Sequence, residues 1–191
     1  MLNKVSRETI DLFHLYLDLL KQWNKAYNLV AFSTIESAMD RHIIDSFQLK
    51  PYLKNSWHIM DVGSGGGLPG LILSYSGFKH ITLIESDQLK ATFLERAAKI
   101  SPNQIKIINK RVEKVFLDDV DVITCRAFSS LANIFALTSH LRVKEKYLLL
   151  KGKKARLEID EALEYWQFDF TLSNSATGDG FVVEIFNLKK K

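Results

Sequence analysis

Hydrophobic positions in the first fifty residues follow the spacing of amphipathic helices. Between residues 10 and 23, apolar side chains recur every three or four positions, as on one buried helix face. They are Ile10, Phe13, Leu17, Leu20 and Trp23. Ser6 is a suitable N-cap for this helix. A second pattern predicts a helix that begins near Ser33 or Thr34 and ends before Pro51, and its inward residues are Ile35, Ala38, Met39, Ile43 and Phe47.

From Trp57 onward, short apolar runs alternate with helical segments. The runs predict strands at residues 58–62, 80–85, 105–108, 120–125, 147–150, 168–172 and 181–186. The intervening patterns predict helices at residues 68–76, 87–99, 112–116, 129–140 and 156–165. Alternation of this kind indicates an α/β fold with a mostly parallel, doubly wound sheet and helices on both faces. The last two strands are joined by a polar stretch, so we expect them to form an antiparallel edge.

The pattern therefore predicts a single domain over residues 1–191. Its N-terminal helical cap spans residues 1–56, and its α/β core spans residues 57–191. Ligands of such sheets bind at the C-terminal ends of the strands, where the strand order reverses. A glycine-rich stretch follows the first predicted strand, so we expect it to lie at the ligand site.

Composition and charge narrow the class of protein. The chain is 47% hydrophobic and 25% charged, as in ordinary globular proteins. We see no signal peptide and no apolar run near the ~20 residues of a spanning helix. A single cysteine, Cys125, allows no internal disulfide. We therefore expect a cytoplasmic protein that has no membrane partner and is monomeric.

The net charge is +4, and basic residues gather in one segment. They are Arg142, Lys144, Lys146, Lys151, Lys153, Lys154 and Arg156, with only Glu145 opposing them. Such a run is either a solvated face or a surface that binds nucleic-acid phosphates. Charge alone leaves both interpretations open.

The glycine stretch D-V-G-S-G-G-G-L-P-G (residues 61–70) fits two ligand classes. Gly65, Gly67 and Gly70 match the G-x-G-x-x-G pattern of nicotinamide and flavin enzymes. However, the turn already begins at Gly63, and a carboxylate at Asp61 would repel a pyrophosphate. The other register, D-x-G-x-G-x-G from Asp61 to Gly67, suits S-adenosyl-L-methionine (SAM). An acid near the loop favours the ammonium and sulfonium of this ligand, directly or through water, and glycines allow close backbone approach.

A second acid supports an adenosine-containing ligand. Glu85 ends the second predicted strand, at the usual separation from the glycines for an acid that binds ribose hydroxyls. NAD-binding proteins share this feature, so Glu85 does not choose between the two ligands. No P-loop Lys-Ser/Thr follows the glycines, and no Cys/His spacing predicts a metal site. His42 and Asp45 lie one helical turn apart, but we find no third ligand beside them.

Several motifs together resemble one family. The stretch D-V-G-S-G-G-G-L-P-G-L is similar to the glycine motif of the bacterial RsmG (GidB) family of 16S rRNA guanine-N7 methyltransferases. Further similarities are W-N-K-A-Y-N-L (residues 23–29), R-H-I-I-D-S (41–46), R-V-E (111–113), C-R-A-F (125–128) and K-G-K (151–153). The resemblance covers nearly the whole chain. One departure is Glu85, where the family often has the shorter Asp.

The resemblance implies a Rossmann-like class I SAM-dependent methyltransferase with a seven-stranded sheet. It implies contacts of Gly63 and Leu68 with SAM, of Glu85 with its ribose, and of Val112 and Glu113 with its adenine. Asp61, Gly65 and Gly67 complete the cofactor loop, and Arg126 lies at the site after the fourth strand. The substrate implied is a guanine N7 in 16S rRNA or the small ribosomal subunit.

The chemistry of the sequence agrees with this substrate. Guanine N7 carries an in-plane lone pair, so orientation alone can suffice and no general base is required. After the fourth strand we find neither the Asn/Asp-Pro-Pro-aromatic motif of amine methylation nor a Pro-Cys nucleophile. Arg126 is a candidate for orienting the base. Candidates for RNA phosphates are Arg41, His42, Lys151, Lys153 and Lys154.

Other functions remain open from the residues themselves. Another RNA or a small molecule is an alternative substrate for the same fold. A non-catalytic RNA-binding module is an alternative from a different class, and an NAD-dependent oxidoreductase is more distant. Arg41 and Asp45 also allow a simple helix ion pair instead of a role in the cap or the site.

Overall fold

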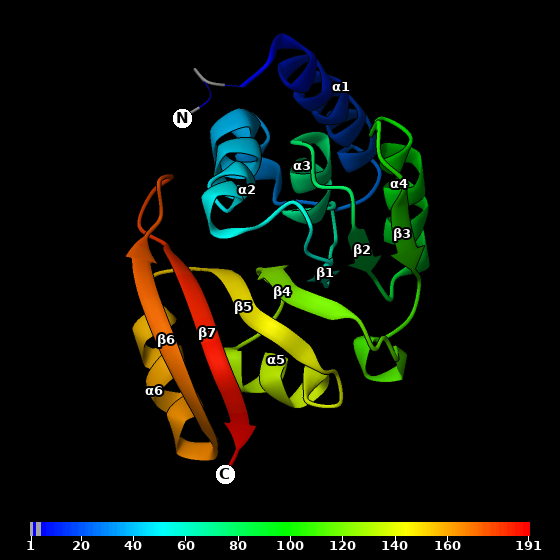
Figure 1. Cartoon of the computed structure of the whole chain (residues 1–191). Helices are drawn as coiled ribbons and strands as arrows, with labels where there is room; N and C mark the ends of the chain where they lie inside the picture. The colour runs from blue at the N-terminus through cyan, green and yellow to red at the C-terminus, as the bar shows by residue number, and fades with distance from the viewer. Residues whose placement is uncertain (1, 3–4) are drawn as a thin grey trace.

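The computed structural model describes residues 2 and 5–191. Its centre is one sheet with the strand order β3-β2-β1-β4-β5-β7-β6 (Figure 1). The strands are β1 (Ile59–Val62), β2 (Ile81–Ile84), β3 (Ile105–Ile108), β4 (Val120–Arg126), β5 (Val143–Lys151), β6 (Trp166–Asn174) and β7 (Phe181–Lys190). β1 to β5 pair in parallel, and β7 runs antiparallel to both β5 and β6. The predicted doubly wound sheet with an antiparallel edge is confirmed.

Helices cover both faces of the sheet because successive strand residues point to opposite sides. In β5, Leu148 joins a core cluster with α3 (Gly70–Tyr75) and α4 (Gln88–Ala98). The next residue, Leu149, joins a second cluster with α5 (Leu131–Thr138) and α6 (Ala155–Tyr165). The short apolar strands are therefore buried on both sides, which explains their continuous hydrophobic runs.

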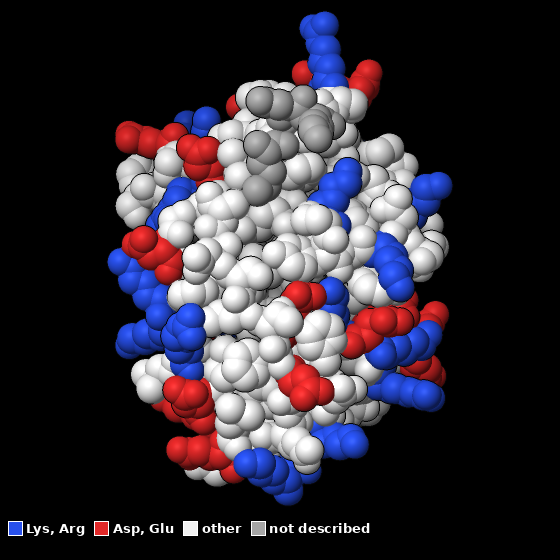
Figure 2. All heavy atoms as spheres, turned by 60° about the vertical axis from the view of Figure 1, so that its left-hand side comes forward, with Lys and Arg blue, Asp and Glu red and all other residues white. Residues whose placement is uncertain are grey.

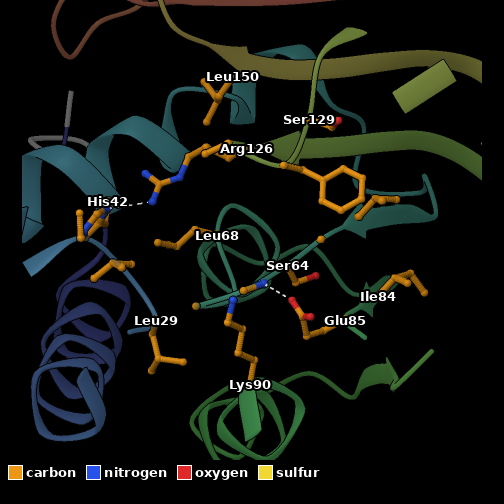
Figure 3. A pocket seen from close by; sticks show the side chains of 18 of the residues that line it. Leu29, His42, Ser64, Leu68, Ile84, Glu85, Lys90, Arg126, Ser129 and Leu150 are labelled. Atoms are coloured by element: carbon orange, nitrogen blue, oxygen red, sulfur yellow. Dashed lines mark hydrogen bonds between the residues drawn. The ribbon is translucent and has the colours of Figure 1, made fainter. Parts of the chain in front are cut away.

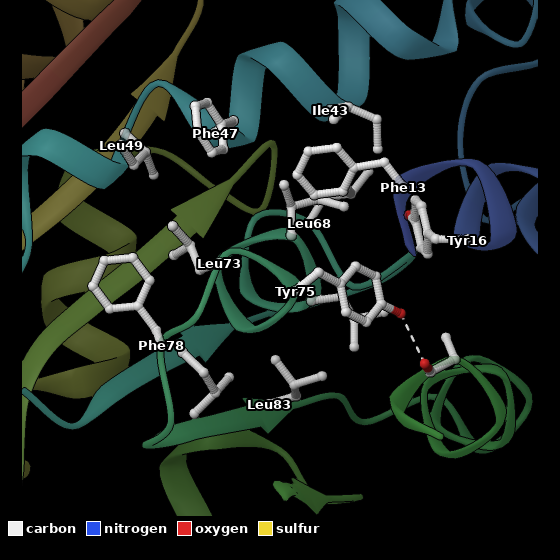
Figure 4. Packing of buried hydrophobic residues seen from close by; sticks show 14 of the residues in the cluster. Phe13, Tyr16, Ile43, Phe47, Leu49, Leu68, Leu73, Tyr75, Phe78 and Leu83 are labelled. Atoms are coloured by element: carbon white, nitrogen blue, oxygen red, sulfur yellow. Dashed lines mark hydrogen bonds between the residues drawn. The ribbon is translucent and has the colours of Figure 1, made fainter. Parts of the chain in front are cut away.

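The N-terminal helix packs on the α3 side of the sheet. α1 (Arg7–Asn24) begins after Ser6, whose side chain accepts a hydrogen bond from the Thr9 amide, so the predicted N-cap is confirmed. Phe13 and Tyr16 of α1 are fully buried against the cluster that contains Tyr75 of α3 (Figure 4). Burying each such aromatic side chain contributes about 2–3 kcal/mol. The cap and the core thus share hydrophobic packing.

The second predicted helix is wrong as one continuous element. The chain forms a 3-10 turn (Phe32–Thr34), a π-helical segment η3 (Met39–Ile44), a short α2 (Asp45–Phe47) and another 3-10 turn (Lys50–Tyr52). Nevertheless, Ala38, Ile43 and Phe47 are buried as predicted. The cause of the π-helical segment lies in the contacts of Arg126, described below. Across the described residues, no helix is long and apolar enough to cross a membrane.

The strand order reverses between β1 and β4, which lie side by side at the centre of the sheet. Parallel strands bring their C-terminal ends to one edge, so the loops after β1 and β4 meet there. The first is the glycine loop, residues 63–67, and the second begins at Arg126. The fold therefore places both predicted motifs at one site.

Candidate active site

A cavity of about 1030 Å³ opens at this edge of the sheet (Figure 3). Its lining comes from the glycine loop, from the ends of β2, β4 and β5, and from residues 28–34 of the cap. The predicted site residues that line it are Arg41, His42, Gly63, Gly65, Leu68, Glu85, Val112, Glu113, Arg126 and Lys151. Asp61, Gly67, Lys153 and Lys154 do not.

The glycine loop is held by contacts from several elements. Gly63 has a φ of +66°, a left-handed conformation that glycine adopts without strain. A Cβ at this position would lie 2.1 Å from the ring of Phe128, so only glycine lets the two loops meet this closely. From the cap, the buried Tyr16 hydroxyl donates to the Gly66 carbonyl at 2.7 Å. The N-terminal helix thus fixes the loop that the sequence marks as the cofactor site.

Asp61 faces the interior beneath the loop. Its side chain is fully buried, and its two carboxylate oxygens accept from the Thr124 hydroxyl at 3.0 Å and the Gly70 amide at 3.3 Å. Burial raises the pKa of Asp61 to about 7, although these hydrogen bonds partly oppose the rise. The sequence placed this acid beside the ligand, whereas the structure places it outside the lining, as a support for the loop.

Glu85 connects the glycine loop to the end of β2. Its carboxylate accepts from the Gly65 amide at 2.9 Å and from the Asp87 amide at 2.8 Å, and its side chain lines the cavity. The residue is only 8% exposed. Each carboxylate oxygen keeps a further lone pair, so the group remains able to accept from ribose hydroxyls.

The predicted adenine residues follow β3. Val112 is buried and Glu113 is exposed, both in the 3-10 turn η5 (Val112–Lys114), and both line the cavity. Sequence reasoning missed Ile84, which ends β2 and presents an apolar surface to the same region. It also missed Leu29 and Val30, whose amides are fixed by the buried side-chain oxygen of Asn24. Their apolar character alone gave no signal, because it matches ordinary core residues.

Arg126, at the end of β4, binds the cap. Its guanidinium donates to the Arg41 carbonyl at 2.8 Å, lies 3.2 Å from an Asp45 carboxylate oxygen, and contacts His42 Nδ1 at 2.9 Å (Figure 3). Asp45 therefore pairs with Arg126, and the simple Arg41–Asp45 helix pair is not observed. The planar fork of arginine suits several simultaneous acceptors.

The π-helical segment makes these contacts possible. In an α-helix the Asp45 amide would bond to the Arg41 carbonyl, four residues earlier. Here it bonds to the carbonyls of Asp40 and His42, which frees the Arg41 carbonyl for Arg126. Insertion of a side chain into the helical hydrogen-bond ladder is a recognised cause of such irregularity. The helical pattern in the sequence could not predict this contact with Arg126 of β4.

His42 is neutral in this arrangement. Burial, followed by the positive charge of Arg126, lowers its pKa to about 4. Its Nδ1 accepts from Arg126, so the proton lies on Nε2 and donates to the Thr34 hydroxyl at 2.9 Å. Both ring nitrogens are therefore engaged, and His42 links the cap segment 28–34 to the end of β4.

The basic run does not form one continuous surface. Lys144 and Lys146, early in β5, pair with Asp119 and Glu184. Lys151 is nearly buried and contacts Glu158 at 2.7 Å and the Ser129 carbonyl. On the face shown in Figure 2, acidic groups lie among the basic ones, both at the margin and near the middle.

Three basic candidates remain at the surface near the cavity. Lys153 forms an exposed pair with Asp179 at 2.7 Å, and Lys154 and Arg41 are exposed. Arg41 also lines the cavity, beside Thr177 from the loop between β6 and β7. Sequence reasoning missed this loop, because its distance along the chain from the cap gave no signal.

Cys125 is unsuited to nucleophilic catalysis. It is buried at the end of β4, and burial raises the pKa of its thiol to about 12. A protonated thiol is a poor nucleophile at neutral pH. This agrees with its interpretation as a small core residue.

Two solved structures with a similar fold contain bound SAM. One is magnesium protoporphyrin IX methyltransferase (ChlM) from Synechocystis PCC 6803 with bound SAM, with a TM-score of 0.60 and 12% identity over 97% of this chain and 99% of that one. Another is an MtNAS mutant in complex with S-adenosylmethionine, with a TM-score of 0.61 and 12% identity over 93% of this chain and 75% of that one. These likenesses define the fold as the Rossmann-like fold of class I SAM-dependent methyltransferases.

Comparison of sequences identifies the family, whereas the similar structures define only the fold. The profile of the family described as rRNA small subunit methyltransferase G (GidB) matches residues 9–179. Ribosomal RNA small subunit methyltransferase G of Rickettsia prowazekii is 47% identical over 189 residues, 98% of each chain. The protein of the same name from Rickettsia massiliae is 46% identical over 100% of this chain and 99% of its own. The chain therefore belongs to the rRNA small subunit methyltransferase G family, and the predicted enzyme class and cofactor, SAM, are confirmed.

Replacing Glu85 with alanine is expected to weaken SAM binding by about 1–3 kcal/mol, about 5- to 150-fold. The variant loses the candidate ribose acceptor and leaves the Gly65 amide without its partner. Calorimetry measures the change, with Glu95→Ala on the exposed face of α4 as the matched control. Unaltered affinity in Glu85→Ala would exclude the ribose role.

Proposed function

We propose that this protein transfers the methyl group of SAM to N7 of a guanine in 16S rRNA, by direct in-line displacement. The observation that carries the proposal is the state of the titratable groups around the cavity. Both nitrogens of His42 are engaged, Glu158 pairs with Lys151, and Asp45 pairs with Arg126. The other carboxylates of the lining, Glu85 and Glu113, lie in the region proposed for ribose and adenine. Among the described residues, the part of the cavity proposed for the base therefore holds no unpaired carboxylate or imidazole to act as a general base, and N7 of guanine needs none.

The cavity suits the cofactor. The glycine loop exposes its backbone at the end of β1, and Glu85, Val112 and Glu113 line the region where ribose and adenine are proposed to bind. When bound, SAM supplies a methyl group activated by its sulfonium. The residues of this chain then have to bind and orient, and a rigid site serves this purpose best. Arg126, fixed by three partners on the cap, is proposed to hold that wall of the site and to orient the base.

RNA is proposed to approach along the exposed side of the cavity. Arg41, Lys153 and Lys154 are candidates for phosphate contacts, since each is exposed. His42 and Lys151 are proposed to act indirectly, by positioning the loops that carry the other residues. We further propose a monomer that acts in the cytoplasm without a membrane partner, built from the cap (residues 1–56) and the α/β core (57–191).

The decisive experiment is a methylation assay on defined RNA. The protein is incubated with labelled SAM and 16S rRNA, either naked or in small subunits, from cells that lack this enzyme. The proposal expects one labelled product, N7-methylguanine, at a single position. Label on an exocyclic amine, on C5 or on another RNA would contradict it. Saturable NAD binding without SAM binding would also contradict the cofactor assignment.

A further inference from the structure

Directly after β4, the chain presents an exposed aromatic side chain to the cavity. Phe128 is 38% exposed and belongs to the cavity lining. The preceding residue, Ala127, has a φ of +51°, which is uncommon for a residue other than glycine. Unfavourable backbone of this kind persists where surrounding contacts impose it, commonly at functional sites. We call residues 126–130, from the last residue of β4 to the N-cap of α5, the post-β4 loop.

Both ends of the post-β4 loop are held. At its start, Arg126 is fixed to the cap by His42 and Asp45. At its end, Lys151 donates to the Ser129 carbonyl and also pairs with Glu158. Glu158 in turn accepts from the Leu131 amide at 3.1 Å, in the first turn of α5. The loop is therefore rigid while its aromatic side chain stays accessible.

The Phe128 ring lies against the glycine loop. A Cβ built on Gly63 falls within 2.1–2.8 Å of three ring atoms, so the ring covers the bare backbone of that glycine. The ring therefore sits where the end of β1 and the end of β4 meet. A flat group that lies on the exposed side of this ring is held next to the proposed methyl donor.

Stacking on aromatic side chains is the common way in which proteins bind unpaired RNA bases. Guanine is large and flat, and the proposed reaction requires its N7 edge to be free. Stacking uses the face of the base and leaves that edge unobstructed, whereas a side-chain donor at N7 would block the lone pair. The aromatic ring of Phe128 meets this requirement.

We propose that Phe128 is the stacking platform on which the target guanine lies during methyl transfer. The inference rests on the proposed function, because it assumes a guanine substrate. It adds a substrate-binding residue whose role is separate from cofactor binding. Gly63 has a second role in this arrangement, since it allows the platform to approach the cofactor loop.

The test compares Phe128→Leu, Phe128→Trp and Phe116→Leu. Phe116 is 77% exposed and its ring packs on His140, outside the cavity lining, so it is a matched aromatic control. For each variant we measure SAM and S-adenosylhomocysteine affinity, RNA affinity at several salt concentrations, and the single-turnover rate of methylation of 16S rRNA.

We expect Phe128→Leu to lower the ratio of rate constant to RNA dissociation constant by about 10-fold or more, the effect of losing one stacked base. SAM affinity should stay within about twofold. The salt dependence of RNA binding should keep its slope, because an uncharged contact releases no counterions. Phe128→Trp should retain most activity, and Phe116→Leu should match the wild-type protein.

Different failures are distinguishable. If Phe128→Leu loses affinity for SAM but not for S-adenosylhomocysteine, the ring contacts the sulfonium and the proposal is wrong. If Phe128→Leu methylates as fast as the wild type, the base lies elsewhere, and Phe32, the other exposed aromatic on the lining, is the next candidate. If the wild-type protein itself methylates no guanine, the proposed function fails, whatever Phe128 does.

Discussion

Asp61→Asn is expected to remove a contribution of the Asp61 carboxyl that lowers the stability of the wild-type protein as pH rises from about 4 to about 7. Burial raises the pKa of Asp61 from its ordinary 3.8 to about 7, and the hydrogen bonds, that of Thr124 first, and the charge of Arg126 oppose the rise only in part. The folded protein thus holds this proton more tightly than the unfolded chain. The Asp61 contribution to the free energy of unfolding therefore falls as pH rises through this window, and its loss is complete above about pH 7. The lowered pKa of His42 contributes in the opposite direction between about pH 4 and pH 6.5, so the effect of Asp61 is read from the difference between the variant and the wild type.

The size of the effect follows from the two pKa values. The gap between 3.8 and about 7 corresponds to about 4 kcal/mol. Asparagine has nearly the same shape, and it can accept from the Gly70 amide while donating to the Thr124 hydroxyl. Urea unfolding at pH 4 and pH 8 measures the difference between the variant and the wild type at each pH.

Asp160→Asn is a matched control, because Asp160 is exposed on α6. Its stability should follow the wild-type pH profile. If the free energies of unfolding of Asp61→Asn and the wild type changed in parallel with pH, ionisation of Asp61 would not lower the stability. SAM affinity of Asp61→Asn should change little, since the carboxylate supports the loop from outside the cavity lining. A large loss of SAM affinity with an intact fold would restore the direct contact that the sequence suggested.

The order of strands and helices was readable from the sequence because each of these elements is specified locally. Short apolar runs that alternate with helical segments, with glycines after the first run, predict a parallel sheet. This prediction uses only local sequence patterns and needs no knowledge of contacts between distant residues. The segment from Ser33 to Pro51 was different. Its apolar spacing was correctly helical, and Ile43 and Phe47 are buried. Yet its backbone is set by Arg126, more than eighty residues later in the chain, as the 85-residue separation of Arg126 and Arg41 shows.

Candidate site residues divide in the same way. Glu85 and the glycines could be named from one strand and one loop, because ligand position follows strand ends. Partners of these residues depend on tertiary contacts. The Asp45 carboxylate accepts a hydrogen bond from the Thr177 hydroxyl at 2.7 Å, and the two residues are 132 positions apart. The sequence of neither segment predicts this contact. The basic run could not be divided into paired and unpaired side chains for a related reason, since charge along the chain does not reveal that Lys146 and Lys151 are paired and nearly buried.

Arg126→Ala is expected to lower the free energy of unfolding by about 2–4 kcal/mol. Breaking a buried ion pair commonly costs 3–5 kcal/mol because the remaining charge loses its partner, and modest exposure reduces this. The Arg126 and Asp45 side chains are 17% and 19% exposed. Arg126→Lys should recover only part of the loss, because an ammonium cannot reach Asp45, His42 and the Arg41 carbonyl together. Urea unfolding at pH 7 measures the free energy of unfolding of the wild type, of Arg126→Ala and of Arg126→Lys.

A double-mutant cycle separates the pair from the rest of the network. Combining Arg126→Ala with Asp45→Ala should cost about 1–2 kcal/mol less than the sum of the single variants. The comparison pair is Lys153 and Asp179, which are 77% and 73% exposed and lie 2.7 Å apart, closer than the 3.2 Å of Arg126 and Asp45. Distance alone would rank the lysine pair as the stronger. Solvent screening predicts the reverse, a coupling below about 1 kcal/mol for the exposed pair. Equal coupling energies in the two cycles would mean that Arg126 is as freely hydrated as Lys153, and the cap would not be held to β4 by this contact.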